Sequence, residues 1–237
     1  MGVARLRHVL TWVICVPVTV VYSSAGLVAS FLSSDGHLAH ALARSWARTL
    51  LRAGGVRVRV VGLDAATAAR ESCVYVCNHQ SALDIPAVMA TLPGQLRFLA
   101  KASLFRIPFS GWYMTRVGYV PVDRRDPKRA LRVLKRAREA GAGGTAILVF
   151  PEGTRIAEGT LGPLKRGSFH VARDAGLDIG PVAVLSSGRL MPAGGWRVEP
   201  GTIEIRIGEP ILADPSATPR QLAETTRGAL AALGGWN

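Results

Sequence analysis

Apolar and polar positions along the chain alternate in a way that predicts strands separated by helices. From residue 55 onward, short and nearly continuous apolar runs are followed by stretches with helical periodicity. Continuous apolar runs are typical of strands that are buried on both faces of a sheet. The strands that we expect are Val56–Val61, Cys73–Cys77, Leu96–Ala100, Gly118–Val122, Ala146–Phe150, Val182–Leu185 and Thr202–Ile207. The predicted fold class is α/β, with a mostly buried mixed or parallel sheet flanked by helices.

The periodic stretches predict helices at Ala82–Thr91, Pro127–Ala140, Leu164–Asp174 and Pro219–Leu233, and the second of these is strongly basic. A cluster of proline and glycine around Pro192–Gly201 predicts a loop inside a single folded domain. At 237 residues the chain is long enough for one sizeable core. We therefore expect N-terminal membrane-associated helices at residues 1–54 and one domain at residues 55–237.

The chain begins with a basic tip and a long apolar stretch. Arg5 and Arg7 precede an uncharged segment from Val9 to Ser34. Its length suits a transmembrane helix, which needs roughly 20 apolar residues. A cleaved signal peptide would also begin with a basic tip and an apolar core. The apolar sequence resumes after a break, however, and does not give way to a polar start, so we favour a membrane-associated segment.

Two interruptions predict that this stretch is a hairpin and not one helix. Pro17 and the Ser23–Gly26 segment would leave shorter helices at Val9–Tyr22 and Ala25–Leu32. The positive-inside rule keeps the basic N-terminus cytoplasmic, and the basic segment that follows the stretch belongs on the same side. A re-entrant or interfacial hairpin satisfies both conditions. It predicts that the protein lies on the cytoplasmic face of the cell membrane.

The next segment, His37–Arg52, predicts a basic amphipathic helix. Its arginines recur every four residues, at Arg44, Arg48 and Arg52. Its apolar contacts would come from Leu38, Leu42, Trp46 and Leu50. Such a helix can lie on an anionic leaflet. The alternative is that the arginines form the solvated face of an ordinary core helix.

Composition favours a membrane surface over nucleic acid as the partner. Lys and Arg number 29 against 16 Asp and Glu, which gives a net charge of +13, and 49% of residues are hydrophobic. Only 6% are aromatic, and no recognition-helix, zinc-finger or stacking pattern is present, so we expect no nucleic-acid partner. The three cysteines, Cys15, Cys73 and Cys77, form no disulfide framework. Buried small hydrophobes explain Cys73 and Cys77 more simply than a metal site or a thiol nucleophile.

His79 and Asp84 are the first candidates for catalysis. They lie in Asn78–Asp84, directly after the apolar run Cys73–Cys77. An imidazole and a carboxylate at the end of a buried strand are the parts of a general base and its orienting acid. Ser81 and Asp84 also fit a capping box that would open the next helix. The two interpretations are compatible, because a strand-to-helix turn can fold the carboxylate back onto the ring.

A second motif, Phe150–Arg155, follows another predicted strand and combines an acid, a glycine turn and an arginine. The carboxyl edge of the strands is the usual site location in open α/β sheets. Gly153 would let the backbone approach a ligand, and Arg155 offers a bidentate fork for phosphate. A tight turn with an exposed arginine is the alternative. Other cations that would join an anion-binding floor are Lys101, Arg124 and Lys165.

Together these motifs resemble the glycerolipid (lysophospholipid) acyltransferases, the family typified by 1-acylglycerol-3-phosphate acyltransferase. The family's H-x4-D box matches His79–Asp84, and its G-x-I-x-I-D-R box matches Gly118–Arg124. Its F-P-E-G-T-R-S box matches Phe150–Arg155, with Ile156 in place of the usual serine, and its fourth box matches Pro181–Val184. Order and spacing agree over about residues 50–212.

The resemblance implies a glycerolipid acyltransferase-like fold. It also implies transfer of a fatty acyl group from acyl-CoA or acyl carrier protein to a lysophospholipid hydroxyl, most simply 1-acylglycerol-3-phosphate giving phosphatidic acid. His79 would be the general base and Asp84 its orienting acid. The substrate-binding residues that it implies are Lys101, Arg124, Glu152, Gly153, Thr154, Arg155 and Lys165. The cations would hold the acceptor phosphate, and we expect neither metal nor cofactor. The alternatives are another acceptor, such as a lyso-ornithine lipid, and a non-enzymatic membrane-binding module.

Overall fold

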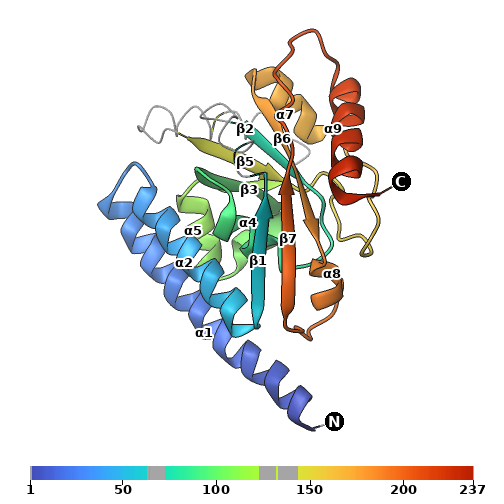
Figure 1. Ribbon diagram of the computed structural model, residues 1–237. Helices are drawn as coiled ribbons and strands as arrows, with labels where there is room; N and C mark the ends of the chain where they lie inside the picture. The colour runs from blue at the N-terminus through green and yellow to red at the C-terminus, as the bar shows by residue number, and fades with distance from the viewer. Residues whose placement is uncertain (1, 63, 65–72, 123–131, 133–143, 237) are drawn as a thin grey trace.

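The computed structural model describes residues 2–62, 64, 73–122, 132 and 144–236 (Figure 1). A seven-stranded sheet lies at the centre of this described part. In spatial order its strands are β1 (Val56–Val61), β7 (Gly201–Ile207), β6 (Asp178–Leu185), β2 (Cys73–Cys77), β5 (Thr145–Val149), β3 (Gln95–Lys101) and β4 (Val120–Val122). All seven predicted strands are confirmed, although β6 begins earlier than predicted. The predicted basic helix Pro127–Ala140 falls largely outside the described residues, and Arg124 falls wholly outside them.

The sheet is mixed, as predicted. Strands β2 to β6 run parallel to one another, whereas β7 is antiparallel to β6 and parallel to β1. In the β2–β5 pair, Val76 lies opposite Val149. Because parallel strands end at the same edge, this register brings the residue after β2 next to the residue after β5. The predicted catalytic motif, Asn78–Asp84, and the predicted substrate-binding motif, Phe150–Arg155, therefore start side by side.

Helices cover both faces of the sheet, which explains why β2 is apolar at every position. One layer contains α4 (Asp84–Thr91), α2 (His37–Ala53) and α5 (Ser110–Arg116), and α1 (Gly2–Leu32) lies along α2 on its outside. The other layer contains α7 (Gly167–Ala175) and α9 (Pro219–Gly234). Cys73, Tyr75 and Cys77 pack into the first layer, while Val74 and Val76 pack into the second. Two further short helices in the described part of the chain are η1 (Ala102–Arg106) and α8 (Ser187–Leu190).

The predicted break in the N-terminal apolar stretch is wrong. A single helix, α1, runs from Gly2 to Leu32 with Pro17 inside it. The Ser23–Gly26 segment does not interrupt the helix, because Ser23, Gly26, Ala29 and Ser30 are buried at helical spacing. Small side chains on one face let neighbouring elements approach closely, and the Tyr113 ring lies directly against Gly26. The helical pair in this region is α1 with α2, and not two halves of the stretch.

Helix α2 also differs from its prediction as a surface helix. Its alanines Ala39, Ala43 and Ala47 are buried. Arg44 donates hydrogen bonds to the carbonyls of Leu92 and Gly94, beyond the C-terminal end of α4. The Trp46 indole donates to Thr19 Oγ1 of α1 (3.0 Å). Arg44 and Trp46 therefore join the layers of the protein, as the core-helix alternative expects, whereas Arg48 and Arg52 are exposed.

The outer face of α1 remains strongly apolar. Leu6–Leu32 is long and apolar enough to cross a membrane, judged by length and composition alone, and 28% of its most apolar window is buried. Large side chains such as Val13 and Val21 are 60% and 63% exposed. A helix with one buried and one exposed apolar face has surface left for a further partner.

Candidate active site

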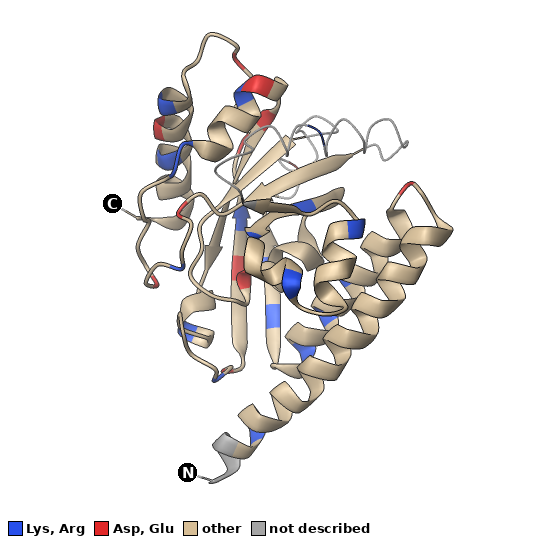
Figure 2. Ribbon diagram, turned by 180° about the vertical axis from the view of Figure 1, so that it is seen from behind, with Lys and Arg blue, Asp and Glu red and all other residues tan. Residues whose placement is uncertain are grey.

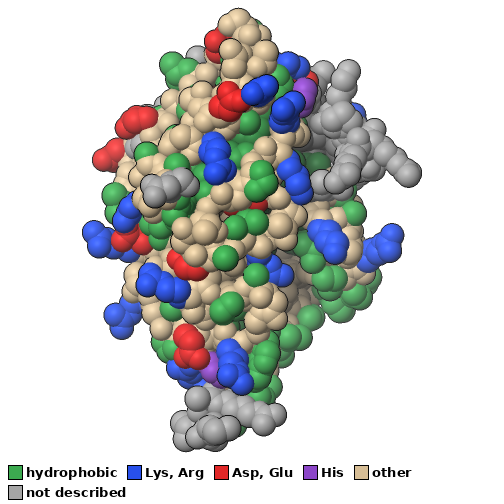
Figure 3. Space-filling view, turned by 90° about the vertical axis from the view of Figure 1, so that its right-hand side faces the viewer, with side chains coloured by type: hydrophobic (Ala, Val, Ile, Leu, Met, Phe, Trp, Pro, Cys, Tyr) green, Lys and Arg blue, Asp and Glu red, His purple; other side chains and the backbone are tan. Residues whose placement is uncertain are grey.

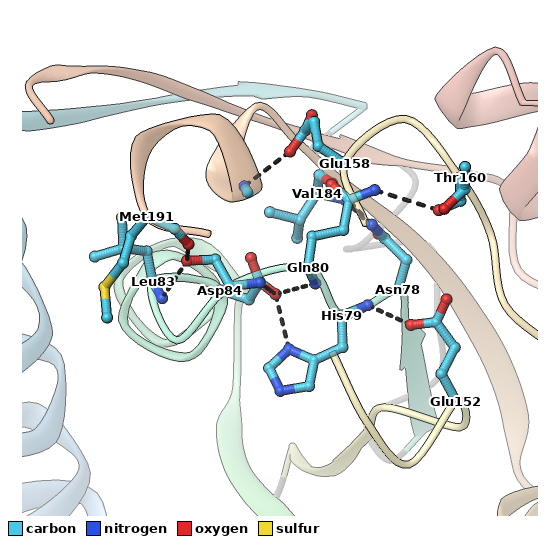
Figure 4. A network of polar contacts seen from close by, with 12 residues as sticks. Asn78, His79, Gln80, Leu83, Asp84, Glu152, Glu158, Thr160, Val184 and Met191 are labelled. Carbon is cyan, nitrogen blue, oxygen red and sulfur yellow. Dashed lines mark hydrogen bonds and ion pairs between the residues drawn. The ribbon is translucent and has the colours of Figure 1, made fainter. Parts of the chain in front are cut away.

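The His79 imidazole and the Asp84 carboxylate are in direct contact. His79 Nδ1 lies 2.8 Å from Asp84 Oδ2, and the carboxylate is completely buried while the imidazole is 16% exposed (Figure 4). The ring stacks on Phe150, with centroids 4.1 Å apart. Because Asp84 occupies Nδ1, the opposite nitrogen, Nε2, is the one left to exchange a proton with a substrate. The predicted catalytic pair is therefore assembled by the turn between β2 and α4.

Backbone amides hold Asp84 in place for this contact. The Asp84 Oδ2 atom accepts hydrogen bonds from the backbone amides of Gln80 (2.8 Å) and Ser81 (2.9 Å), in addition to the ring. Ser81 Oγ donates to the Met191 carbonyl (2.7 Å) and accepts from the Leu83 amide (3.2 Å). The predicted capping box is thus half formed, since Asp84 reaches back to Ser81 but Ser81 does not cap the Asp84 amide. The carboxylate is aimed at the ring by the same turn that starts the helix.

Glu152, in the second motif, is hydrogen-bonded to the first motif. Its Oε2 accepts from the His79 amide (2.7 Å) and its Oε1 from the Gly162 amide (2.8 Å). Burial raises the pKa of this carboxyl, and the two backbone donors act in the opposite direction. The Ile156 amide adds a hydrogen bond to the His79 carbonyl (2.7 Å). This contact comes from the backbone of residue 156, so it does not depend on the side chain that replaces the family's usual serine.

Two polar residues that sequence reasoning missed complete the scaffold. Asn78 continues the pairing of β2 with β6, because its side-chain amide donates to the Val184 carbonyl (2.9 Å) and accepts from the Val184 amide (2.7 Å). Glu158 accepts from the amides of Ser186 and Gly188, both at 2.8 Å. The Gln80 side-chain amide is oriented so that its nitrogen donates to Glu158 Oε2 (3.0 Å) and its oxygen accepts from the Gly159 amide. Asn78 could have been identified from the sequence, because it is an asparagine that directly follows a predicted strand. No sequence pattern indicates the role of Glu158.

Comparisons with known proteins identify the family of the part of the chain that contains this site. The acyltransferase family model matches residues 57–185, which include His79, Asp84 and Phe150–Arg155. The chain belongs to the acyltransferase family. This confirms the resemblance that the motifs indicated. The matched residues also include Asn78, Glu152 and Glu158, whereas Ser186, Gly188 and Met191, which complete the scaffold, lie just beyond the match.

Relatives of this acyltransferase include the chloroplastic 1-acyl-sn-glycerol-3-phosphate acyltransferase of Brassica napus. It is 35% identical over 173 residues, which cover 73% of this chain and 50% of that protein. The 1-acyl-sn-glycerol-3-phosphate acyltransferase of Pseudomonas aeruginosa is 35% identical over 171 residues, or 72% of this chain and 65% of that protein. The chain spans about half the length of the plant relatives that it matches.

A solved structure is similar over almost the whole chain. The crystal structure of the 1-acyl-sn-glycerophosphate acyltransferase PlsC from Thermotoga maritima superimposes with a TM-score of 0.78 at 26% sequence identity. The match covers 97% of this chain and 94% of that chain. It therefore includes the N-terminal helices as well as the sheet, and the predicted glycerolipid acyltransferase-like fold is confirmed.

Those predicted substrate-binding residues that the structure describes lie at the same edge of the sheet. Lys101 ends β3, and Thr154, Arg155 and Lys165 are exposed beyond β5. Gly153 has a positive φ of 71°, and the end of the Lys165 side chain occupies the space that a Cβ would need. The structure thus brings Lys165 onto the second motif. Figure 3 shows one face of the molecule with cationic side chains spread across it, and not gathered in a single patch.

The cysteines are buried, and burial raises the pKa of their thiols. Cys73 and Cys77 are 2% and 0% exposed, and the pKa of Cys73 rises to about 12. The pKa of the Cys77 thiol is also well above its ordinary value. A buried, protonated thiol is a poor nucleophile. The two residues therefore act as small hydrophobes of β2, as the sequence indicated.

Proposed function

We propose that this acyltransferase moves a fatty acyl group from an acyl thioester to the free hydroxyl of 1-acylglycerol-3-phosphate, giving phosphatidic acid. The observation that carries the proposal is the His79 Nδ1–Asp84 Oδ2 contact, which leaves Nε2 of a partly exposed ring to meet a substrate. The relatives with this acceptor in their names support the choice of acceptor. The thioester donor is acyl-CoA or acyl carrier protein.

The proposed reaction is a direct transfer. His79 Nε2 accepts the proton of the acceptor hydroxyl while the hydroxyl oxygen attacks the thioester carbonyl. The tetrahedral intermediate then collapses, the carbon–sulfur bond breaks, and the imidazolium returns the proton to the thiolate. Asp84 holds the ring in one tautomer and stabilises the imidazolium, because its carboxylate is buried at hydrogen-bond distance. The step invokes no metal and no covalent enzyme intermediate.

The acceptor phosphate would be held by the cations at the edge of the sheet. Arg155 and Lys165 follow β5, Lys101 ends β3, and Arg124 belongs to the same predicted set although it lies outside the described residues. Arginine can bind a phosphate through two parallel hydrogen bonds. Glu152 would shape this region indirectly, since both of its carboxylate oxygens already accept backbone amides.

We also propose that the protein works at the cytoplasmic surface of an anionic membrane. Both the acceptor and the product are lipids, and the outer face of α1 exposes large apolar side chains over most of its length. A helix of this kind can lie with one face in the bilayer interface while its other face packs on the protein. The net charge of +13 would favour a leaflet that carries anionic lipids.

The test is product analysis by mass spectrometry. The purified full-length protein is offered a mixture of lysolipids with acyl-CoA or acyl carrier protein, and phosphatidic acid is the expected product. His79→Ala should lower turnover by about a hundredfold or more. His170→Ala, at an exposed position of α7 outside both motifs, is the matched control and should keep wild-type turnover. A well-folded His79→Ala protein with near-normal transfer would exclude this function.

A further inference from the structure

The segment between β3 and α5 exposes a group of large apolar side chains next to the catalytic edge. Leu104, Ile107, Phe109 and Trp112 are 37%, 47%, 39% and 55% exposed. Single exposed hydrophobes are ordinary on soluble proteins, but a contiguous group marks an interaction surface. We call these residues, from Leu104 to Trp112, the aromatic loop.

The backbone of the aromatic loop is strained in a way that keeps its rings at the surface. Phe109 has a φ of 62° and a ψ of −65°, in a tight turn closed by a hydrogen bond from the Ser110 amide to the Pro108 carbonyl (2.7 Å). This turn type is rare and strained for a residue with a side chain. The Phe109 ring lies beside the Trp112 ring, with centroids 5.3 Å apart. Strain that displays two half-exposed aromatic rings brings little burial to the folded chain, so a partner outside the chain is the better explanation.

The aromatic loop is fixed rigidly to α1 and α2 through α5. The Tyr113 hydroxyl donates to the Ala39 carbonyl (3.1 Å), and its ring packs on Gly26. Arg116 donates to the Ser30 carbonyl (3.1 Å) and lies over the Phe31 ring at 4.6 Å. The end of α1 at this junction is itself apolar, since Phe31 is 70% exposed. The loop and the outer face of α1 therefore belong to one side of the molecule.

Charge around the aromatic loop selects an anionic partner. No acidic residue occurs between Ile85 and Val122. Lys101, Arg106 and Arg116 are exposed within the same stretch, and the view from behind shows basic but no acidic positions on η1 and α5 (Figure 2). Aromatic rings flanked by exposed cations fit the interface of an anionic bilayer, where the rings enter the acyl boundary and the cations meet the headgroups.

A line of aromatic rings connects the loop with the catalytic histidine. His79 stacks on Phe150, which lies 6.4 Å from Phe98 between ring centroids. Phe98 lies 5.6 Å from Tyr119, and Tyr119 lies 6.1 Å from Tyr113 of α5. The element that carries the loop is thus packed against the same aromatic core that supports the site. If a surface binds the loop, this packing fixes the distance between that surface and His79.

We propose that the aromatic loop is a second membrane-contact element, separate from α1, which inserts Ile107, Phe109 and Trp112 into an anionic leaflet and sets the catalytic edge against the bilayer. The inference rests on the proposed function, because an acceptor that leaves the leaflet must reach His79. With α1 alone on the bilayer the molecule could rotate about one helix axis. Contact at two elements fixes its orientation.

The first test is sedimentation of the full-length protein with phosphatidylcholine vesicles, with and without phosphatidylglycerol. The double variant Ile107→Ser/Trp112→Ser should partition about tenfold less to anionic vesicles than the wild type, because large apolar side chains no longer leave water. The matched control is Val61→Ser/Leu212→Ser, which removes exposed apolar side chains elsewhere (43% and 66% exposed) and should partition like the wild type. Equal partitioning of the loop variant and the wild type overturns the proposal.

A second measurement keeps the test valid if the double variant folds poorly. Brominated acyl chains quench tryptophan fluorescence at short range, so wild-type fluorescence should fall on such vesicles by more than that of Trp112→Phe. Identical quenching of the two proteins places Trp112 outside the bilayer and overturns the proposal. Trp112→Phe keeps an aromatic ring in the loop, so its fold should be unaffected.

Transferase assays distinguish a failure of this inference from a failure of the proposed function. The loop variant should keep wild-type turnover on a short-chain, monomeric acceptor and lose about tenfold on acceptor embedded in vesicles. Equal activity of loop variant and wild type on both acceptors contradicts the loop contact alone. A wild-type protein that transfers no acyl group, but whose Trp112 is quenched, contradicts the proposed function and supports the loop contact.

Discussion

The turn around His79 and the outer face made by α1 and the aromatic loop distribute polar and apolar groups in opposite ways. Around His79, the polar residues Asn78, Gln80, Ser81 and Asp84 are all at most 1% exposed. On the outer face, Leu32 is 77% exposed and Trp112 is 55% exposed. Burying polar groups is favourable only when each has a partner, and exposing apolar groups is favourable only when something covers them. In the first region the polar side chains find partners within the chain, except that Asp84 Oδ1 is buried without a hydrogen-bond partner among the described residues. The second region is the one that we propose is covered by another surface.

The largest expected effect comes from removing the charge at the centre of the buried turn. Asp84→Asn keeps the shape of the side chain but removes the charge that stabilises the imidazolium, so turnover should fall by about a hundredfold or more. An amide can also place its NH2 group against the ring or against the backbone donors, which disturbs the ring tautomer. Turnover of a vesicle-embedded acceptor and the circular dichroism spectrum are measured together. Partitioning to vesicles should not change, because the outer face is untouched.

Asp174→Asn is the matched control for Asp84→Asn. Asp174 lies on α7, where its exposed side chain pairs with the neighbouring Arg173. Exposed pairs of this kind contribute about 0–1 kcal/mol. Turnover should therefore stay near the wild-type value. Loss of activity in both variants to the same degree would mean that Asp84 has no special role.

A smaller effect is expected from a substitution of Glu158, which contacts the turn through Gln80 and is not part of the His79–Asp84 pair. Glu158→Gln leaves one acceptor oxygen for two amide donors, Ser186 and Gly188, so a charge-assisted hydrogen bond of about 1.5–3 kcal/mol is lost. Because Gln80 lies between Glu158 and Asp84, turnover should fall by about tenfold while the acceptor KM stays constant. Thermal unfolding and steady-state kinetics measure the two effects. Glu224→Gln, at an exposed pair on α9, is the control.

A lower melting temperature with unchanged kcat would show that Glu158 supports the fold without positioning the catalytic pair. In that case the buried turn extends only as far as Gln80. A lower kcat with an unchanged melting temperature would mean that the buried turn extends through Glu158 to α8. Either result sharpens the boundary of the region that must be held in place for catalysis.

The two regions also differ in how well the sequence predicts them. The turn around His79 was predictable because it is local: His79 and Asp84 are close in sequence, and both motifs follow continuous apolar strands. The hydrogen-bond partners of Asn78, Glu152 and Glu158 lie on strands and loops that are far away in sequence. These hydrogen bonds can therefore be predicted only once the order of the strands in the sheet is known. At the N-terminus, Ser23 and Gly26 suggested a break by composition. Their role depends on Tyr113, which is far away in sequence and packs on that face of the helix.

That tertiary role of Gly26 can be tested with a pair of identical substitutions. A methyl group at Gly26 would come within 2.7 Å of the Tyr113 ring, whereas nothing lies within 4 Å of the same position at Gly228 in α9. Alanine is favoured over glycine in a helix interior by about 1 kcal/mol. Gly228→Ala should therefore raise the free energy of unfolding by about that amount. Gly26→Ala should lower it by about 1–2 kcal/mol, because overpacking outweighs the helix propensity.

Urea unfolding of the two variants measures this difference directly. Gly26→Ala should keep near wild-type turnover on a monomeric acceptor, because the buried turn is not touched, and should weaken the attachment of α5 to α1. Equal stabilisation by both substitutions would mean that the close approach of Tyr113 to α1 is not needed. The N-terminal stretch would then be an independent helix, and the outer face would not be one rigid surface.

The smallest expected effect is a pH dependence in α2, the layer that lies between the two regions. Burial, with Arg44 and Arg97 nearby, lowers the pKa of His40 to about 3. In the unfolded chain its pKa is about 6.5, so the unfolded state binds a proton between these values that the folded state does not. The stability that neutral His40 provides is complete above about pH 6.5 and is lost as the pH falls toward 3. The slope is at most about 1.4 kcal/mol per pH unit.

His40→Gln removes this proton from the balance. The Arg44 Nε donates to His40 Nε2 (3.1 Å), and a glutamine oxygen can accept the same hydrogen bond without titrating. The free energy of unfolding is measured in urea from pH 7 to pH 5 for both proteins. The wild type should lose more stability on acidification than the variant, while both keep the same turnover at neutral pH because His40 lies on α2 and not in the turn around His79. If the free energy of unfolding changes with pH equally in both proteins, His40 is solvated. In that case α2 does not exclude water from the layer between the outer face and the turn around His79.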